Sequence, residues 1–216
     1  MNKGRVYIIS GPSGSGKDTV LKKIFEKCPQ VAFSISSITR PMREGEVEGE
    51  KYNFVTREHF EEMIANDQLL EHNVFVGNYY GTPKDYVEQQ MEAGRDVILE
   101  IEIQGAMKVK EQFPNAILLF VMPPSIAELH QRLVGRGTET EEVIMERLLR
   151  AYEEAVGIEE YDYIIINDDL DACVKELHEL LTKSHEEIQT QYHPNNYVEL
   201  IEDIRTQLKG LVKGEK

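Results

Sequence analysis

Cysteine is scarce in this sequence. The two cysteines, Cys28 and Cys173, stand far apart and in no metal-ligand spacing. A disulfide framework like those of small secreted domains is therefore not expected, and a reducing compartment fits better. With 216 residues, of which 41% are hydrophobic, the chain can form a core without a disulfide or a structural metal.

Long hydrophobic runs are also missing. The segment MNKGRVYIIS reaches Gly11 before an apolar run of signal-peptide length develops. No stretch approaches the roughly 18 consecutive apolar residues that span a bilayer. We therefore predict a cytoplasmic protein without a transmembrane helix.

Positive charge is in the minority. The chain has 24 Lys and Arg residues against 39 Asp and Glu residues, a formal net charge of −15. A uniformly acidic surface repels polynucleotides and anionic membranes, so we expect neither nucleic acid nor a membrane as a partner. A small phosphorylated ligand can still bind where basic side chains gather locally.

What the sequence does contain is an alternation of short apolar runs and helical patterns. The runs have the length of strands buried on both faces and lie at residues 6–10, 96–101, 116–121 and 163–166. The helical patterns lie at residues 17–27, 104–112, 125–134, 140–152 and 168–182. Capping-box spacing at Ser125 with Glu128 and at Thr138 with Glu141 predicts two helix starts. The alternation predicts an α/β fold with a parallel sheet flanked by helices.

Two segments depart from this alternation. Residues 34–90 are rich in glycine and hold strand-like pieces at 52–55 and 69–76 around a helical pattern at 57–66, which predicts a small mixed α/β insertion. Beyond about residue 185, we expect a short amphipathic helix with one apolar face, formed by Val198, Ile201, Ile204 and Leu208. Packing of that face on the core and packing on a second subunit are both open.

A phosphate-binding loop is the strongest local motif. Residues 11–17 read GPSGSGK, a G-x-x-x-x-G-K pattern between an apolar strand and a helical pattern. Glycines allow positive φ and close approach to an anion, and the N–H groups at the helix start then point at the phosphates. We predict that ATP phosphates bind to Gly11, Pro12, Ser13, Gly14, Ser15, Gly16 and Lys17.

The position after the lysine departs from the usual pattern. A serine or threonine there would offer its hydroxyl to Mg²⁺, but this chain has Asp18, followed by Thr19. Asp18 could help to hold Mg²⁺, or it could point away as a first-turn acid favoured by the helix dipole. Both interpretations are open.

Further motifs follow in order along the chain: SISSITRPMREGE (34–46), EKYNF (50–54), GNYYGTP (77–83), ILEIEIQGA (98–106), VMPPS (121–125), GRGTETEE (135–142) and INDDLD (166–171). Together with GPSGSGK they resemble the guanylate kinases over about residues 5–185. The resemblance implies a P-loop NTPase core at 1–33 and 91–185 with a helical lid at about 125–155, and a GMP-binding insertion at 34–90. We expect residues 186–216 to form a C-terminal tail with a short helix.

The resemblance also implies the activity. Guanylate kinases transfer the γ-phosphate of ATP to GMP, giving ADP and GDP, in purine nucleotide metabolism. We expect the same reaction here, with Mg²⁺ as cofactor, with dGMP also accepted, and with a monomer or homodimer as the assembly.

The acceptor site is predicted within the insertion. The guanidinium groups of Arg40 and Arg43 can bind a phosphate bidentately, and Tyr52 and Tyr80 can add hydrogen bonds. By resemblance, these positions hold the phosphate of GMP, and Glu71 matches the carboxylate that reads the base. A carboxylate accepts both protons of the guanine N1–N2 edge, whereas adenine would leave it buried and unpaired.

Other polar residues are assigned to the acceptor by resemblance. Ser36 and Thr82 match hydroxyl positions near O6, although Thr82 before Pro83 also reads as a helix N-cap. Glu100 and Glu102 lie two apart in a strand pattern and should face the same side. The resemblance puts Glu102 near GMP and Glu100 near the metal, whose candidate ligands are Asp18, Thr19 and Glu100.

The donor side is predicted to carry three arginines besides Lys17. Arg132 and Arg136 are four apart, and Arg147 lies one helix further on. In the family, arginines at these positions close over the transferring phosphate, which needs in-line positioning and positive charge. The candidate catalytic residues are therefore Lys17, Arg132, Arg136 and Arg147. Asn167 matches a position near the ATP adenine.

Two rival functions are weighed against this one. Asp18 after the loop lysine is also a feature of the ribose 1,5-bisphosphate kinases, but these would not need a guanine-reading carboxylate such as Glu71. A non-catalytic guanylate-kinase-like interaction module would typically lose the loop lysine, yet Lys17 and the three arginines are present.

Overall fold

The chain folds into two compact units, Met1–Ile8 with Gln30–Ile117 and Ile9–Pro29 with Leu118–Lys216. The computed structural model describes residues 3–75, 77–135, 140–183 and 192–213. The predicted strand at residues 6–10 is β1 (Val6–Ser10), and its residues are divided between the two units. The larger of two sheets has the strand order β2-β7-β1-β8-β9. The predicted boundaries of core, lid, insertion and tail stay a prediction.

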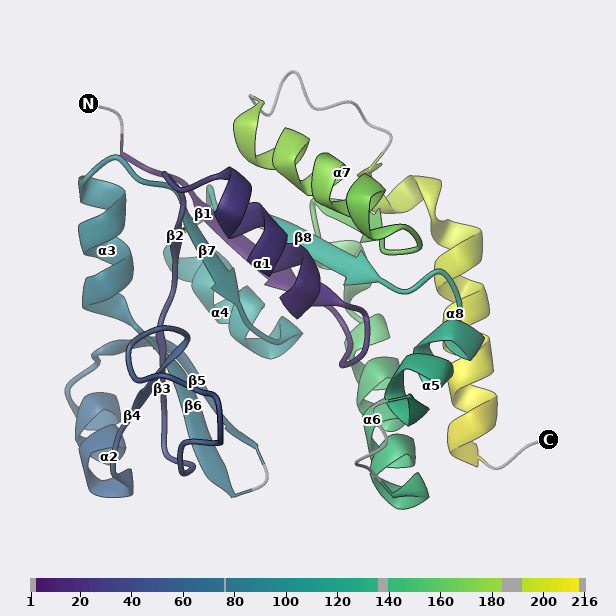
Figure 1. Cartoon of the computed structure of the whole chain (residues 1–216), viewed down its shortest axis with the longest axis horizontal. Coiled ribbons are helices and arrows are strands. Elements are labelled where there is room, and N and C mark those ends of the chain that lie inside the picture. Colours follow the sequence, from purple (N-terminus) through teal and green to yellow (C-terminus); the bar gives the residue numbers. More distant parts are fainter. Residues whose placement is uncertain (1–2, 76, 136–139, 184–191, 214–216) are drawn as a thin grey trace. The chain divides into compact units, whose positions relative to one another are not determined.

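The first unit holds the strands β2 and β7 of the larger sheet and a four-stranded sheet (Figure 1). β2 (Ala32–Phe33) pairs parallel with β7 (Val97–Glu100). The four-stranded sheet has the order β4-β3-β6-β5, with strands β3 (Ser36–Ile38), β4 (Tyr52–Phe54), β5 (Leu69–Phe75) and β6 (Asn78–Pro83). The helices are α2 (Arg57–Ala65), α3 (Lys84–Glu92) and α4 (Ile103–Gln112).

Helix α2 covers one face of the four-stranded sheet. Its start is capped by Thr56, whose side chain accepts the His59 N–H. Buried Phe60 packs in a cluster with Leu69, and its ring stacks on Tyr79 with 5.0 Å between centroids. Helix α2 and the four-stranded sheet therefore share a small apolar core.

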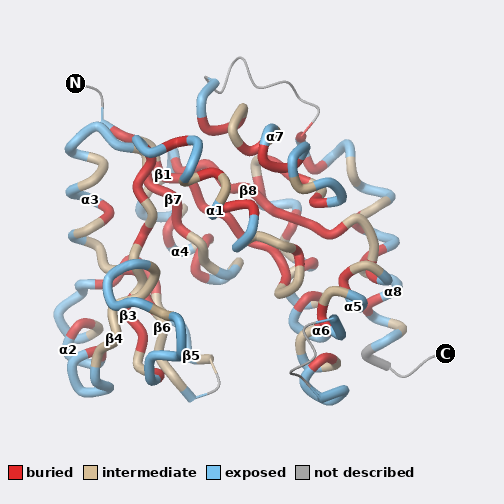
Figure 2. The backbone as a smooth tube through the Cα atoms, in the orientation of Figure 1, coloured by how far each residue is buried: buried red, intermediate tan, exposed pale blue. Residues whose placement is uncertain are grey.

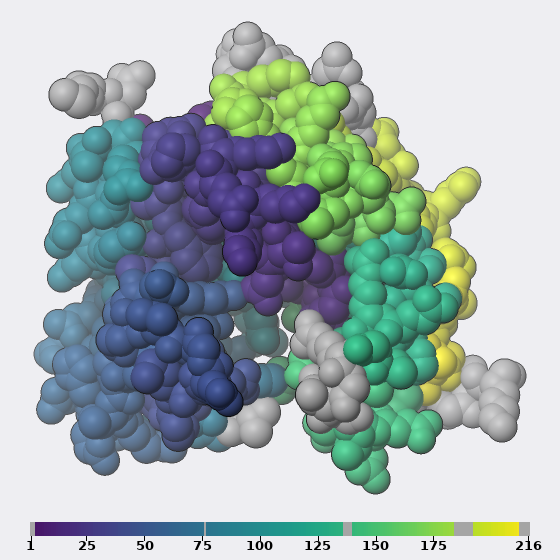
Figure 3. All heavy atoms as spheres, viewed as in Figure 1, coloured from purple at the N-terminus to yellow at the C-terminus, as the bar shows by residue number. Residues whose placement is uncertain are grey.

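The second unit is built on a parallel pair, β8 (Ile117–Met122) with β9 (Tyr163–Ile166). Every residue of β8 is buried, as Figure 2 shows, which fits a strand covered on both faces. Around the pair lie the helices α1 (Lys17–Lys27), α5 (Ile126–Val134), α6 (Glu141–Ala155), α7 (Leu170–Thr182) and α8 (Val198–Lys213). Helices α1 and α7 lie side by side in Figures 1 and 3 and pack on each other. The described part of the unit also contains the short 3₁₀ helices η1 (Ile158–Glu160) and η3 (Pro194–Asn196).

The predicted α/β alternation is confirmed, and capping explains the shifts at helix starts. Ser125 is extended (φ −160°) and accepts the Glu128 N–H at 3.1 Å, so α5 begins one residue later than predicted. Asp169 caps α7 in the same way. The expected cap Thr138 lies outside the described residues, and the structure assigns the cap of α6 to Thr140.

The predicted C-terminal helix forms and packs within its own chain. Ile201, Ile204 and Leu208 of α8 are 3%, 3% and 1% exposed, and α8 contacts α6 and α5. Val198, at the first position of α8, is 54% exposed and does not share this burial. Of the two alternatives for this face, packing within the chain is therefore confirmed. Within the described ranges, no helix is long and apolar enough to cross a membrane.

The burial of α8 makes a direct prediction. Leu208→Ala should lower the free energy of unfolding by about 2–5 kcal/mol, because it leaves a cavity in a packed interface. The matched control is Leu211→Ala on the same helix, where the leucine is 38% exposed and the loss should stay below about 1 kcal/mol. Urea denaturation of both variants measures the difference. Equal, small losses would show that α8 does not pack as described.

Candidate active site

The phosphate-binding loop runs from β1 into α1 and depends on its glycines. Gly11 and Gly16 have φ values of 143° and 89°, which side chains rarely allow. A Cβ atom would lie 2.1 Å from the Val121 carbonyl oxygen at Gly11, and 2.2 Å from Nδ2 of Asn167 at Gly16. Gly16 is the N-cap of α1, and among the described residues no side chain caps this helix start. The first N–H groups of α1 are therefore placed to bind an anion.

Two polar side chains of the loop face inward. Lys17 Nζ donates a hydrogen bond to the Gly11 carbonyl at 2.6 Å, so the ammonium group lies over the loop itself. The Ser15 side chain is fully buried, and its hydroxyl makes no hydrogen bond with the described part of the chain. A buried polar group without a partner is costly, and a phosphate oxygen is a partner of the right chemistry.

Three predicted donor-side residues contact this loop. Asn167 Nδ2 donates to the Ser15 carbonyl at 2.7 Å. Arg132 donates from Nη2 to the Asn167 carbonyl at 2.9 Å and from Nε to Glu128 at 2.9 Å. Arg147 Nη1 donates to the Ser13 hydroxyl at 2.6 Å. The fourth predicted donor-side residue, Arg136, lies outside the described residues.

Asp18 and Thr19 occupy the first turn of α1, and both are exposed. An acid in this position is favoured by the helix dipole whether or not a metal binds. In the described ranges, no group of three or more His, Cys, Asp or Glu side chains forms a candidate metal site.

On the acceptor side, strand register gathers the predicted residues. Ser36 lies opposite Tyr52, and Glu71 lies opposite Thr82. The antiparallel register of β3 with β6 also puts Ser36 across from Thr82. Directly opposed side chains lie on the same face of a sheet. Tyr80 is two residues from Thr82 on β6, so it lies on that face as well. Five predicted acceptor residues therefore lie on one face of the sheet, opposite to the face that carries Tyr79 and Gly81 against Phe60 of α2.

Glu71 is the most constrained of these residues. It is 8% exposed, and the fully buried Thr82 donates its hydroxyl to Glu71 Oε1 at 2.7 Å. A Cβ atom at Gly105 of α4 would lie 2.8 Å from Oε2, so a glycine there leaves room for the carboxylate. Burial raises the pKa of Glu71, while the Thr82 hydrogen bond and the charge of Lys108 act in the opposite direction. The expectation that Thr82 caps α3 was wrong, because Pro83 is the N-cap and the Thr82 hydroxyl is committed to Glu71.

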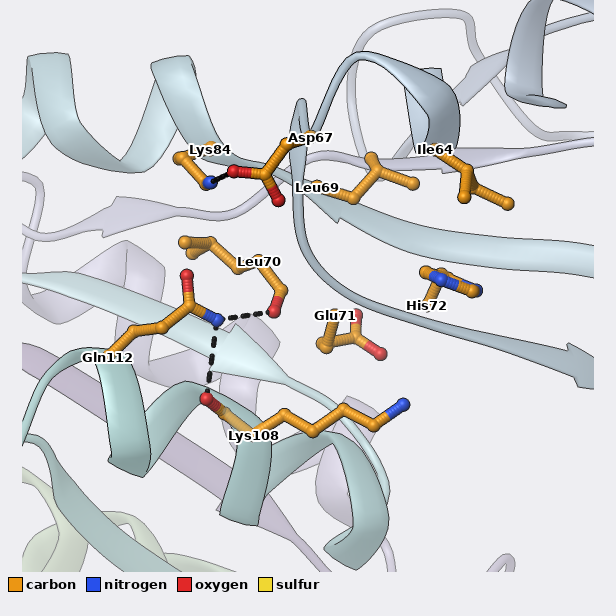
Figure 4. Close-up of a pocket in the computed structure, with 9 residues that line it drawn as sticks. All are labelled: Ile64, Asp67, Leu69, Leu70, Glu71, His72, Lys84, Lys108 and Gln112. Atoms are coloured by element: carbon orange, nitrogen blue, oxygen red, sulfur yellow. Dashed lines mark hydrogen bonds and ion pairs between the residues drawn. The ribbon is translucent and has the colours of Figure 1, made fainter. Parts of the chain in front are cut away.

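A cavity of about 250 Å³ adjoins Glu71 at the edge strand β5. Its walls include His72 on β5 and Lys108 and Gln112 on α4. Figure 4 shows Lys108 extending from α4 alongside Glu71, and Gln112 donating to the Leu70 carbonyl at 2.7 Å. Helix α4 thus supplies the charged neighbour of Glu71 and is tied to the strand that carries it.

The two predicted phosphate-binding arginines meet a carboxylate of their own loop. Arg40 donates two hydrogen bonds to Glu46, from Nη1 at 2.7 Å and from Nη2 at 2.5 Å, and the Arg43 N–H donates to Glu46 at 2.8 Å. These bonds hold the pKa of Glu46 at about 2, well below the ordinary value. Arg40 is 9% exposed and lies over the rings of Tyr52 and Phe54. Its guanidinium fork is therefore already ordered for an anion.

Glu100 and Glu102 do not lie on one strand as predicted. β7 ends at Glu100, which forms an ion pair with Lys51 at 3.0 Å. Glu102 is the N-cap residue of α4 and accepts a hydrogen bond from Asn73 at 3.1 Å. The strand that was predicted to carry both residues ends at Glu100, so strand periodicity does not apply to Glu102.

Sequence reasoning missed Glu46, Gly105 and Lys108. The segment REGE offered Glu46 as a charge near the arginines, but Glu44 is closer to both arginines in sequence and no pattern selects Glu46. Gly105 and Lys108 belong to α4 and reach Glu71 only through tertiary packing.

Comparisons with known proteins identify a family for this chain. The sequence model of the family described as guanylate kinase matches residues 3–184. The guanylate kinase of Desulfitobacterium hafniense is 51% identical over 180 residues, which are 83% of this chain and 90% of that protein. The guanylate kinase of Halalkalibacterium halodurans is 46% identical over 194 residues, which are 88% of this chain and 95% of that protein.

A solved structure extends the likeness to the fold. The crystal structure of guanylate kinase from Anaplasma phagocytophilum has a TM-score of 0.70 to this chain and 33% sequence identity, covering 88% of this chain and 89% of that one. The predicted P-loop NTPase type of α/β fold is thereby confirmed. On its sequence, its fold and its phosphate-binding loop, the chain belongs to the guanylate kinase family.

Proposed function

We propose that this chain transfers the γ-phosphate of ATP to GMP, giving ADP and GDP. The observation that carries the proposal is the shared sheet face of Ser36, Tyr52, Tyr80, Thr82 and Glu71. A buried carboxylate and two tyrosine hydroxyls on one face suit a ligand with a guanine at one end and a phosphate at the other. Family membership supports the same reaction.

Glu71 reads the base in this proposal. Its carboxylate accepts hydrogen bonds from the N1 and N2 donors of guanine, while Thr82 occupies one acceptor position of Oε1. Adenine has no such donor pair and would leave the buried charge unpaired. Ser36 and Thr82 provide the hydroxyl groups near the base.

Arginines and tyrosines bind the acceptor phosphate. The guanidinium groups of Arg40 and Arg43 bind the phosphate, which either replaces Glu46 as their partner or binds beside it. Tyr52 and Tyr80 donate hydrogen bonds to the phosphate from their hydroxyl groups. Glu102 stands beside the nucleoside by family resemblance. No general base is needed, because the phosphate of a nucleoside monophosphate is already ionised at neutral pH.

The donor phosphates bind to the loop at residues 11–17. Its N–H groups and Lys17 hold the β- and γ-phosphates, and Arg132, Arg136 and Arg147 neutralise charge that spreads over the equatorial oxygens during transfer. Asn167 supports the loop through Ser15. Catalysis then consists of in-line positioning and electrostatic stabilisation.

Mg²⁺ belongs to this proposal as well. It prefers oxygen ligands and is usually bound through one or two carboxylates together with substrate phosphates and water. Asp18 and Thr19, both exposed at the end of the loop, offer a carboxylate and a hydroxyl, and Glu100 is the third candidate. When bound, the ion would neutralise phosphate charge. Acceptance of dGMP, the monomer or homodimer and the cytoplasmic location stay predictions.

The activity is tested by ADP release in the presence of ATP and Mg²⁺, with GMP, AMP, UMP and ribose 1,5-bisphosphate offered separately. We expect turnover with GMP alone. Lys17→Met should lower kcat by at least about 100-fold, because a charge that stabilises the transition state is lost. This variant also controls for a contaminating kinase. Turnover with the ribose compound alone would favour the first rival function, and GMP binding without any turnover would favour the interaction module.

Replacing Glu71 tests base recognition. Glu71→Gln puts an amide donor against the donors of guanine, so KM for GMP should rise about 10- to 100-fold, the loss of one or two bonds to a charged group. The affinity for ATP should not change. Glu88→Gln, an exposed acid on α3, is the matched control. An equal loss of affinity for both nucleotides would contradict the assignment.

The same substitution should affect stability in a pH-dependent way. Because burial raises the pKa of Glu71, its contribution to stability is fully present below the unfolded pKa and is lost as the pH rises through the folded pKa. Gln cannot ionise, so Glu71→Gln should be more stable than the unmodified chain at pH 7. The difference should shrink as the pH falls towards the ordinary glutamate value of about 4.3. Urea denaturation between pH 4.5 and about 8 measures this trend, and a constant difference would refute it.

A further inference from the structure

Helix α8 lies beyond the residues that the family model matches, yet it packs closely on the helix that carries Arg147. Figures 1 and 3 show α8 beside α5 and α6. Ile204 and Leu208 of α8 and Ala151 and Ala155 of α6 are among the residues that line a common cavity of only about 10 Å³. That volume is too small for a ligand. The interface is therefore a packed one.

The C-terminal end of α6 has Val156 as its C-cap, whose N–H donates to the Glu153 carbonyl, and it has no left-handed glycine. Its last residue, Ala155, is followed by Val156 in a helical conformation (φ −68°), and Gly157 has a φ of −107° rather than a left-handed one. The last turn of α6 contains no basic residue. The final carbonyl groups of a helix carry partial negative charge and need donors from elsewhere.

Arg205 of α8 provides these donors. Its Nε and Nη2 donate to the Ala155 carbonyl at 2.8 and 2.6 Å, and Nη2 also donates to the Val156 carbonyl at 3.2 Å. Glu159 and Glu202 accept further bonds from the same guanidinium at 2.6 and 2.9 Å. The side chain is 17% exposed. A planar guanidinium can bind two carbonyls and two carboxylates at once, which a lysine ammonium cannot match.

Helix α6 also contacts the phosphate-binding loop. Arg147 lies roughly two turns before Ala155 on the same helix, and its Nη1 donates to the Ser13 hydroxyl at 2.6 Å. A helix of this length moves as a rigid element. A shift at the end held by Arg205 therefore displaces the guanidinium of Arg147 relative to the loop.

We propose that Arg205 is a positioning residue for phosphoryl transfer, which binds the C-terminal end of α6 and so holds Arg147 at the phosphate-binding loop. This inference rests on the proposed role of Arg147 in the transfer reaction. Arg205 itself touches no substrate. Its effect on turnover passes through Arg147.

A double-mutant cycle tests this coupling. Arg205→Met should lower kcat roughly tenfold, less than the 100-fold that a misplacement of about 1 Å can cost, and should leave KM for GMP within about twofold. In the Arg147→Ala background, the same change should have little further effect on kcat. Lys209→Met, an exposed basic residue on α8, is the matched control and should behave like the unmodified chain. Arg205→Lys should give an intermediate kcat.

The outcomes separate this proposal from the proposed function. The unmodified chain must turn over GMP if the proposed function holds, whatever the variants do. An unchanged kcat in folded Arg205→Met, or an equal loss with and without Arg147, would overturn the positioning role. Thermal unfolding shows which variants are folded, and if Arg205→Met is not, Arg205→Lys and Glu159→Gln enter the same cycle.

Amide hydrogen exchange provides a readout that needs no turnover. Exchange in the last turn of α6 should become faster in Arg205→Met and stay unchanged in Lys209→Met, because only the first variant loses the donors for the helix end. Unchanged exchange in both variants would overturn the proposal even if the enzyme proved inactive.

Discussion

The geometry of the phosphate-binding loop is the constraint from which the donor side follows. The loop must turn from β1 into α1 within a few residues, and it does so through glycines at positive φ that pass close to Val121 and Asn167. This close passage lets Asn167 and Arg147 bind the loop directly. A side chain at Gly11 or Gly16 would disturb the loop and its supports together.

The arginines of this acidic chain are held in place by carboxylates and carbonyls. Glu46 orders Arg40, Glu128 orders Arg132, and Glu159 with the end of α6 orders Arg205. A guanidinium that is already ordered loses less conformational entropy when an anion binds. The same contacts neutralise part of the positive charge of the guanidinium group, so at Arg40 a phosphate has to compete with the carboxylate of Glu46. The excess of acidic residues is therefore compatible with binding two anionic nucleotides.

The acceptor side depends on a different constraint, the burial of Glu71. A carboxylate that is 8% exposed keeps its charge only if neighbours compensate for the lost water. Thr82 does so by a hydrogen bond and Lys108 by its charge, while Gly105 leaves room for the carboxylate. Because the carboxylate is buried, its charge is costly to leave unpaired. A base without two donors would leave it so, and the burial of Glu71 therefore explains both the energetic cost of the charge and the specificity for guanine.

Local pattern alone determined a large part of this protein. The strands at residues 6–10 and 163–166 and the helix at 17–27 were predicted with the bounds that the structure has, because runs of apolar residues and a glycine loop act through neighbours in the sequence. Tertiary structure alone decided the pairing of Arg40 with Glu46, the hydrogen bond from Thr82 to Glu71, the end of β7 at Glu100, and the binding of Arg205 to the end of α6. These features arise from strand register or from packing between distant segments, and a side chain's choice among several nearby partners depends on distances that periodicity does not encode.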